Sequence, residues 1–277
     1  MPFQACMHKS GEKTIMSRTN IFLVLLLSVF SVIIPLAIAE SSDAGRGEFD
    51  PAELPAEEFL RYARRPFIRD AWGYFAGTVQ HRGSSGVERI PVQLSILFKK
   101  DLLKAQLLLD KTQEYNITQI YMGDTPPEVT VTEPERSEGK VKLSDFGLYP
   151  RDITFAFLYW DFIRESSRTE KVRGQQCRVM LLDDPRSARR ARVWFSAKYL
   201  FPLRVHTLGG EDGRVVRELE FTDFKRHDKI WYIKALRLEG TDWKTRVNFR
   251  EAELAYTSEE EPPPNLFAPD VTANALN

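Results

Sequence analysis

The sequence predicts a mainly β protein, an incomplete antiparallel β-barrel of about eleven strands with a short N-terminal helix and a central apolar helix. From residue 71 onward, apolar residues alternate with period two in strand-length segments, and short polar turns separate these segments. Connections this short join antiparallel neighbours. Strands do not alternate with long helices, so the pattern excludes a parallel α/β sheet.

The N-terminus predicts a secretory signal peptide. Residues 21–38 form a long apolar run, which Lys9, Lys13 and Arg18 precede and small residues up to Ala39 close. A basic region, an apolar region and a small-residue cleavage site in this order are typical of exported proteins. We expect cleavage after Ala39. The alternative is an uncleaved membrane anchor, since the run approaches the roughly 20 residues that span a bilayer.

Composition limits the classes of function. The chain has 39 Lys and Arg against 39 Asp and Glu, whereas a general nucleic-acid binder carries a marked basic excess. Removal of the signal peptide also removes Cys6 and leaves Cys177 alone, which excludes an internal disulfide. The mature fold must therefore rest on its hydrophobic core.

After the signal peptide, the chain divides into three expected parts. Residues 40–55 are polar and rich in Gly and Pro, as in a flexible lead-in. One domain then covers residues 56–270, and residues 271–277 form a tail. The domain begins with an amphipathic helix in residues 56–67, which Pro66 ends.

The expected strands form two runs on either side of the middle segment. The first run comprises residues 71–81, 89–100, 102–111, 114–122 and 128–133, and the second comprises 176–183, 191–198, 202–209, 213–224, 230–240 and 244–256. In several strands both faces are apolar, as in residues 96–98, 107–109 and 193–195. A sheet with one solvated face alternates more cleanly, so this excess indicates an apolar interior larger than the sheet's own side chains fill.

Residues 152–163 between the two runs form the most apolar segment of the expected domain. Asp152 is a good N-cap, and apolar groups then surround the expected helix from Ile153 to Ile163. Alternating Ile153, Phe155 and Phe157 also fit a strand, but length and the cap favour a helix. Such a helix must be covered on more than one side, so it is a plug in the concave face of the sheet, a lid over a ligand, or a membrane-contacting element.

The sequence contains no pattern typical of catalysis. It has no G-x-S-x-G elbow, no cysteine signature and no glycine-rich phosphate loop. The histidines of the mature chain, His81, His206 and His227, lie far apart in no zinc motif. We therefore expect no catalytic residues, no metal site, no cofactor and no enzymatic activity.

The densest basic cluster lies between two expected strands, and its members are Arg186, Arg189, Arg190 and Arg192. One interpretation is a docking patch for an anionic headgroup or an acidic partner surface. The other is a solvated hairpin tip, because Asp183 and Asp184 are close enough to compensate the charge.

Several phrases of the sequence, taken together, are similar to a known family. They are Ser144-Asp145, Asp152-Ile153-Thr154, Gly174 to Leu181, Arg192 to Phe195, Pro202 to Val205 and the closing Leu266 to Pro269. With the order of elements, they resemble the LolA-like family of outer-membrane lipoprotein-sorting proteins over residues 56–270. The chain departs from that family where Phe146 to Arg151 separate the S-D phrase from D-I-T.

The resemblance implies an incomplete barrel, closed by helices, whose interior receives acyl chains. The expected protein is an exported, monomeric carrier in the periplasm, with lipoprotein or other acylated lipid as cargo and inner- or outer-membrane proteins as partners. A protein-interaction or lipid-sensing module on the same fold is the alternative. Each methylene that a carrier hides from water contributes about 0.8 kcal/mol, so a dry apolar wall suffices for binding.

The candidate wall residues come from the middle segment and from both runs of strands. They are Phe155, Leu158, Tyr159 and Phe162 from the middle segment, with Leu94, Ile96, Leu107, Leu109, Val193 and Phe195 from the strands. The choice of strand face depends on the register, because a slip of one residue inverts it.

Overall fold

The computed structural model describes residues 50–64, 69–122, 127–133, 142–210, 212–228 and 230–268. The expected signal peptide lies outside these residues. The helical elements are η2 (Pro51–Glu53), α1 (Ala56–Ala63), η3 (Leu143–Phe146), α2 (Pro150–Ile153) and η4 (Ala156–Tyr159). Within the described ranges, no helix is long and apolar enough to cross a membrane.

The strands carry most of the fold. They are β1 (Ala71–Gly83), β2 (Gly86–Lys99), β3 (Leu102–Leu109), β4 (Gln113–Ile120), β5 (Glu128–Thr132), β6 (Asp161–Glu165), β7 (Glu170–Val172), β8 (Gln175–Asp183), β9 (Arg190–Ser196), β10 (Pro202–Gly209), β11 (Arg214–His227), β12 (Ile230–Glu239) and β13 (Lys244–Tyr256). Each of the segments expected as strands is a strand. Two short strands, β6 and β7, were not expected.

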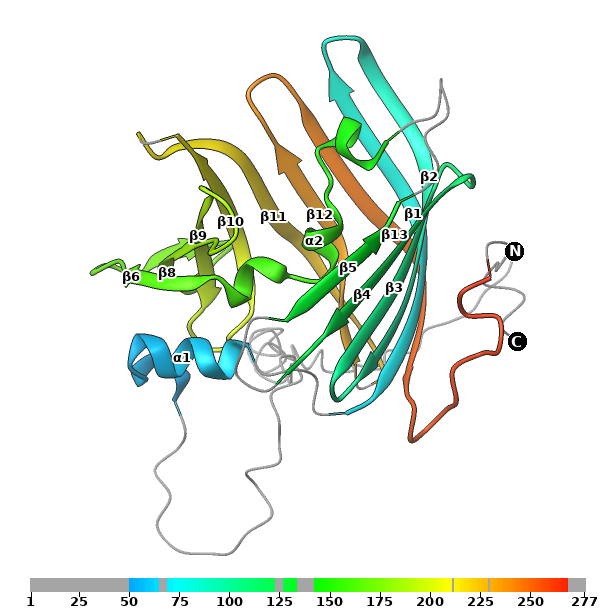
Figure 1. Cartoon of the computed structure of the whole chain (residues 1–277), viewed down its shortest axis with the longest axis horizontal. Coiled ribbons are helices and arrows are strands. Elements are labelled where there is room, and N and C mark those ends of the chain that lie inside the picture. The colour runs from blue at the N-terminus through cyan, green and yellow to red at the C-terminus, as the bar shows by residue number, and fades with distance from the viewer. Residues whose placement is uncertain are drawn as a thin grey trace, which may run out of the picture. The chain divides into compact units, whose positions relative to one another are not determined.

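All the strands belong to one antiparallel sheet that is not closed. Its order is β5-β4-β3-β2-β1-β13-β12-β11-β10-β9-β8-β6, and β7 pairs with β8 beside β6. The two runs of strands join where β13 returns to pair with β1. The sheet bends around residues 142–165, from η3 to β6, which form the middle segment (Figure 1). The expectation of an incomplete antiparallel barrel is confirmed.

The join between the two runs depends on a glycine. The register of β1 and β13 shifts between Ala76 and Gly77, as at a β-bulge. A Cβ added to Gly77 would lie 2.2 Å from the carbonyl oxygen of Asn248. A side chain at this position would therefore push the two runs apart.

The C-terminal segment covers the outer face of β1. Leu266 is buried against Trp72 and Tyr74. The Trp72 indole N–H donates to the carbonyl oxygen of Glu260 at 3.0 Å, and Gln106 donates to that of Phe267 at 2.8 Å. This packing leaves the opposite face of the sheet to the middle segment.

Helix α1 is fixed to the second run of strands. Its buried Phe59 meets the Phe195 ring of β9 edge-on at 5.8 Å. The Arg178 guanidinium of β8 lies 4.5 Å from the centre of the Phe59 ring and donates to the Leu54 carbonyl oxygen at 2.7 Å. The same guanidinium forms a two-pronged ion pair with Glu165 of β6 at 2.6 and 2.7 Å.

The prediction of one central helix from Ile153 to Ile163 is wrong. Helix α2 ends at Ile153, η4 follows, and β6 then pairs with β8. Phe155 has φ 50° and ψ 37°, a left-handed conformation in which an α-helix of L-residues does not continue. Asp152 is not the N-cap either, since it stands in the first turn and its carboxylate accepts a hydrogen bond from the Tyr149 N–H at 2.8 Å.

Candidate functional site

The interior side chains form two hydrophobic clusters. The first cluster gathers buried residues of β1 to β4 and β13 with Leu143 and Phe146 of η3. The second cluster gathers Phe59 and Leu60 of α1, residues of η4, and the inward residues of β8 to β12. Leu148 and Leu236 pack against both, so the two clusters adjoin.

The predicted wall residues divide between these clusters. Leu94, Ile96, Leu107 and Leu109 belong to the first cluster and point to the covered face of the sheet. Leu158, Val193 and Phe195 belong to the second cluster, and Phe155, Tyr159 and Phe162 pack against it. The structure therefore brings them together as two sets, and their role in lipid binding stays a prediction.

The second cluster is rich in ring contacts. The Phe155 ring lies 6.0 Å from that of Phe157, 5.7 Å from that of Phe201 and 5.5 Å from that of Phe221, each at a steep angle. Edge-to-face pairs of this kind add to the free energy of burial. Phe155 therefore stands inside an aromatic core, at the point where the middle segment changes direction.

Arg217 of β11 anchors the beginning of the middle segment. It donates to the carbonyl oxygen of Gly147 at 2.9 Å and pairs with Asp152 at 2.5 Å. Both side chains of the ion pair are about nine-tenths buried. Thr245 of β13 donates to the carbonyl oxygen of Phe146 at 2.6 Å, so its hydroxyl oxygen accepts from His81 Nδ1 at 2.8 Å.

Arg64, just after α1, anchors the other end of the middle segment. It donates to the carbonyl oxygens of Leu158 and Trp160, each at 2.6 Å. The Tyr159 hydroxyl in turn donates to the Arg64 carbonyl oxygen at 2.9 Å. Burial lowers the pKa of Arg64 and raises that of Tyr159. The Arg64 guanidinium therefore holds this end of the segment through backbone carbonyl oxygens. The sequence did not indicate a link between Arg64 and this segment.

Three polar side chains, those of Gln119, Tyr121 and Tyr159, lie beside Arg64, where the two clusters meet. Tyr121 packs against the first cluster and Tyr159 against the second, with ring centres 5.9 Å apart. The Tyr121 hydroxyl also lies beside Gln119, whose side chain is fully buried. Burial raises the pKa of Tyr121. Sequence reasoning did not single out Gln119, although it holds the same inward register as Tyr115 and Ile117.

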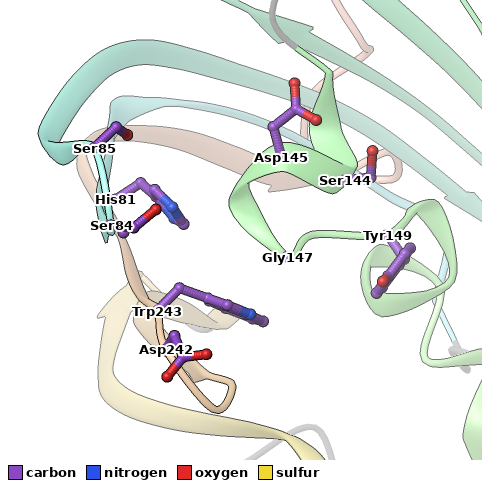
Figure 2. A pocket seen from close by; sticks show the side chains of 10 residues that line it. His81, Ser84, Ser85, Ser144, Asp145, Gly147, Tyr149, Asp242 and Trp243 are labelled. Carbon is purple, nitrogen blue, oxygen red and sulfur yellow. The ribbon is translucent and has the colours of Figure 1, made fainter.

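A polar hollow of about 350 Å³ lies near the anchored start of the middle segment. It is lined by His81, Gly83, Ser84, Ser85, Ser144, Asp145, Gly147, Tyr149, Asp242 and Trp243 (Figure 2). None of the predicted wall residues lines it. Trp243 packs against Gly147 so closely that a Cβ there would lie 2.0 Å from the indole. The hollow therefore lies beside the close contact of Trp243 with Gly147, and it offers acyl chains no apolar wall.

The arginine cluster lies at the β8–β9 hairpin and along β9. Arg186, Arg189 and Arg192 are exposed, and Arg190 donates to the carbonyl oxygen of Gly210 at 3.3 Å. Within the described part of the chain, none of these four pairs with a carboxylate, because Asp184 accepts hydrogen bonds inside the turn instead. A docking role for this cluster stays a prediction.

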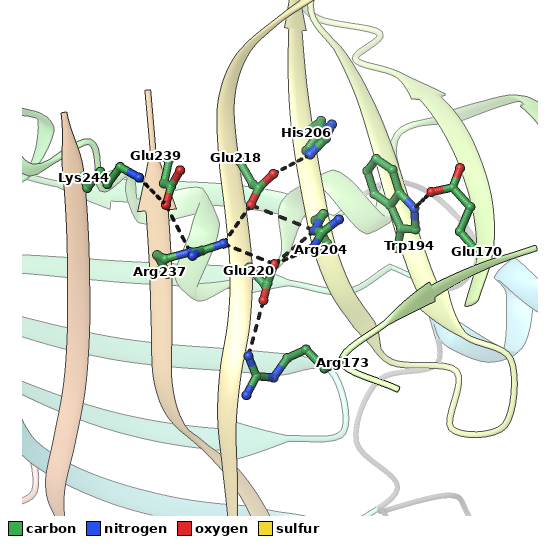
Figure 3. A network of polar contacts seen from close by, with 10 residues as sticks. All are labelled: Glu170, Arg173, Trp194, Arg204, His206, Glu218, Glu220, Arg237, Glu239 and Lys244. Atoms are coloured by element: carbon green, nitrogen blue, oxygen red, sulfur yellow. Dashed lines mark hydrogen bonds and ion pairs between the residues drawn. The ribbon is translucent and has the colours of Figure 1, made fainter. Parts of the chain in front are cut away.

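The opposite face of the second run carries a charged network (Figure 3). Glu220 of β11 is almost fully buried beneath Arg173, Arg204 and Arg237, and Arg204 approaches it to 2.7 Å. His206 Nε2 lies 2.7 Å from Glu218. Burial lowers the pKa of His206 in spite of that carboxylate. In the residues that the structure covers, no three His, Cys, Asp or Glu side chains gather to hold a metal ion.

The fold has counterparts among solved structures. No protein-family model and no curated protein matches the sequence. A DUF1329 family protein from Desulfovibrio piger is 15% identical, and the match covers 83% of this chain and 100% of that chain with a TM-score of 0.59. A candidate outer membrane lipoprotein-sorting protein domain from Vibrio parahaemolyticus is also 15% identical, with 80% and 99% covered and a TM-score of 0.54.

These likenesses define a class of fold. The chain has a LolA-like fold, as its sequence phrases implied. At 15% identity the likeness concerns the fold alone. One fold can host different functions, so the function of this chain depends on its own interior side chains.

Proposed function

We propose that this protein is an exported, non-enzymatic carrier that binds the acyl chains of lipoproteins or other lipids. The observation that carries the proposal is the first cluster. Leu94 and Ile96 of β2 and Leu107 of β3 form an aliphatic wall, and a middle segment outside the sheet covers part of the same cluster. A wall of this kind binds through apolar area and releases its ligand when its cover moves.

The way the middle segment is held supports a movable cover. In the described residues, apart from β6 at its end, it is joined to the sheet through side chains rather than through a ladder of backbone hydrogen bonds. Arg217, Thr245 and Tyr115 of β4 provide these links to the sheet, and Arg64 ties the segment to α1. A few side-chain contacts can open without unpairing strands. Sheet strands therefore stay intact while the aliphatic wall is uncovered.

The test is uptake of a fluorescent 16-carbon fatty acid by the full chain, together with native mass spectrometry of protein purified from its own compartment. The double variant Leu94→Ala and Leu107→Ala should weaken uptake about tenfold or more, because it removes several buried methylenes from the wall. The matched control replaces the exposed Val87 and Val215 with alanine and should bind as the parent does.

Two outcomes would end the proposal. One is protein that is reproducibly free of lipid and takes up no fatty acid. The other is equal loss of uptake in the control variant, which would show non-specific adsorption. An envelope protein-interaction or lipid-sensing module on the same fold stays the alternative prediction, with the arginine cluster as its contact surface.

A further inference from the structure

Gln119 is a polar residue in an apolar place. It is fully buried on β4, in register with Leu103 of β3 and Val129 of β5. Both neighbours belong to or pack against the first cluster. The amide therefore points to the covered face of the sheet, whereas the alternate residue Ile120 is exposed.

Among the described residues, the Gln119 amide has no hydrogen-bond partner of regular geometry. Both Nε2 and Oε1 are buried, and the Tyr121 hydroxyl is the polar group that interacts with this amide, in a geometry short of a regular hydrogen bond. Other buried glutamines differ, since Gln106 donates to Glu114 and to the Phe267 carbonyl oxygen, and Gln113 donates to Thr112. Buried polar groups without partners are rare in proteins, so this one calls for a functional reason.

The surroundings of Gln119 define the chemistry of a partner. An amide and the nearby Tyr121 hydroxyl offer both donors and acceptors, and neither carries charge. Arg64, the cation beside Tyr159, already donates to two backbone carbonyls. Burying an anion here without a free cation would be costly, so the fitting partner is neutral. Apolar clusters on both sides suit the chain that such a group would carry.

We propose that Gln119, with Tyr121, binds the carbonyl group of an ester- or amide-linked acyl chain. This rests on the proposed function and adds a specificity to it. The hydrocarbon lies against the aliphatic wall of the first cluster, and the carbonyl oxygen accepts a hydrogen bond from the Gln119 amide. Free hydrocarbon of the same length lacks that bond. The subsite therefore favours acyl chains over alkyl chains.

The test compares two ligands that differ only in the carbonyl group. Methyl palmitate and its ether analogue of the same length compete with a fluorescent fatty acid for the full-length protein. The parent should bind the ester about five- to tenfold more tightly, which corresponds to one buried hydrogen bond. Gln119→Leu should remove this preference by weakening the ester alone. Gln119→Met serves as a second, unbranched substitution.

Gln113→Leu is the matched control, since Gln113 stands on the same strand and face but its amide already has a partner. It should keep the preference for the ester. Equal binding of ester and ether by the parent, or a preference that survives both Gln119 variants, would overturn the subsite and leave the carrier proposal standing. Failure of both ligands to compete would count against the carrier proposal itself.

Discussion

The two hydrophobic clusters use one sheet in different ways. In the second cluster, the protein fills the concave face with its own groups, since α1 is fixed by Arg178 and the rings around Phe155 interlock. In the first cluster, β2 and β3 present aliphatic side chains, and the cover is a short 3₁₀ helix with the loop around it. One half therefore resembles an ordinary protein core, and the other resembles a wall with a separate cover.

This difference divides the predicted wall residues by expected role. Leu94, Ile96, Leu107 and Leu109 lie in the first cluster and are the ones we expect to contact a ligand. Phe195 lies under α1, Val193 belongs to the same cluster and Phe155 lies among rings, so we expect them to act mainly on folding stability. Variants that separate folding stability from lipid retention test this difference between the two clusters.

The largest effect is expected for Arg217→Met. This change leaves the buried Asp152 carboxylate without its partner and frees the Gly147 carbonyl oxygen. Removal of one member of a buried ion pair costs about 3–5 kcal/mol. We expect the free energy of unfolding in urea to fall by that amount, with loosening of residues around η3 in hydrogen exchange.

Arg237→Met is the control for this variant. Arg237 also contacts carboxylates, but its side chain is 44% exposed on the opposite face of the sheet. Its loss should change the free energy of unfolding by no more than about 1 kcal/mol. Similar losses in the two variants would mean that Arg217 does not anchor the cover.

A smaller effect is expected for Phe155→Ala. The change removes three edge-on ring contacts from the second cluster. Phe→Ala substitutions in cores cost about 3–5 kcal/mol, and the partial exposure of Phe155 places it at the lower end, near 3 kcal/mol. Urea unfolding measures the loss, and displacement of a fluorescent fatty acid measures binding by the fraction that stays folded.

The relative sizes of the stability loss and the affinity loss show where the ligand lies. For Phe155→Ala we expect a large loss of stability and a small loss of affinity. For Leu94→Ala in the first cluster we expect the affinity to change more. The reverse ranking would place the ligand in the second cluster and make Phe155 part of a lid.

The strands could be predicted from the sequence because apolar and polar side chains alternate along them. Inward residues of β4, for example, follow the odd positions from Gln113 through Tyr115 and Ile117, and short turns fix the antiparallel order. Local periodicity and turn chemistry determine these features, so one sequence suffices.

The secondary structure of the middle segment could not be predicted from the sequence, for a physical reason. A stretch that is apolar on every side fits a helix and a strand equally, so periodicity says little. What decides between them is distant, namely pairing with β8 and the carbonyl contacts of Arg64. The left-handed turn at Phe155 lets the chain make both. Likewise, the sequence shows Gln119 as a polar residue in an inward register, but Tyr159, which lies beside its neighbour Tyr121, is far away along the chain.

The smallest effect is expected from His206, and it tests the second half of the sheet alone. Burial lowers the folded-state pKa of His206 from the ordinary value of 6.5, while Glu218 acts in the opposite direction. The unfolded chain therefore binds this proton first as the pH falls. Stability from the neutral imidazole is complete above the unfolded pKa and is lost between about pH 6.5 and the lower folded pKa.

His206→Gln should flatten this part of the pH dependence. We expect the urea midpoint of the parent to fall more between pH 7.5 and pH 5.5 than that of the variant, whereas His227→Gln, at a largely exposed site, should follow the parent. Acidification should also reduce hydrogen-exchange protection in β10 and β11 before it does so in β2 and β3, because His206 lies on β10, behind the second cluster. Parallel curves for parent and His206→Gln, or loss of protection in β2 and β3 first, would show that the two halves do not respond to acid separately.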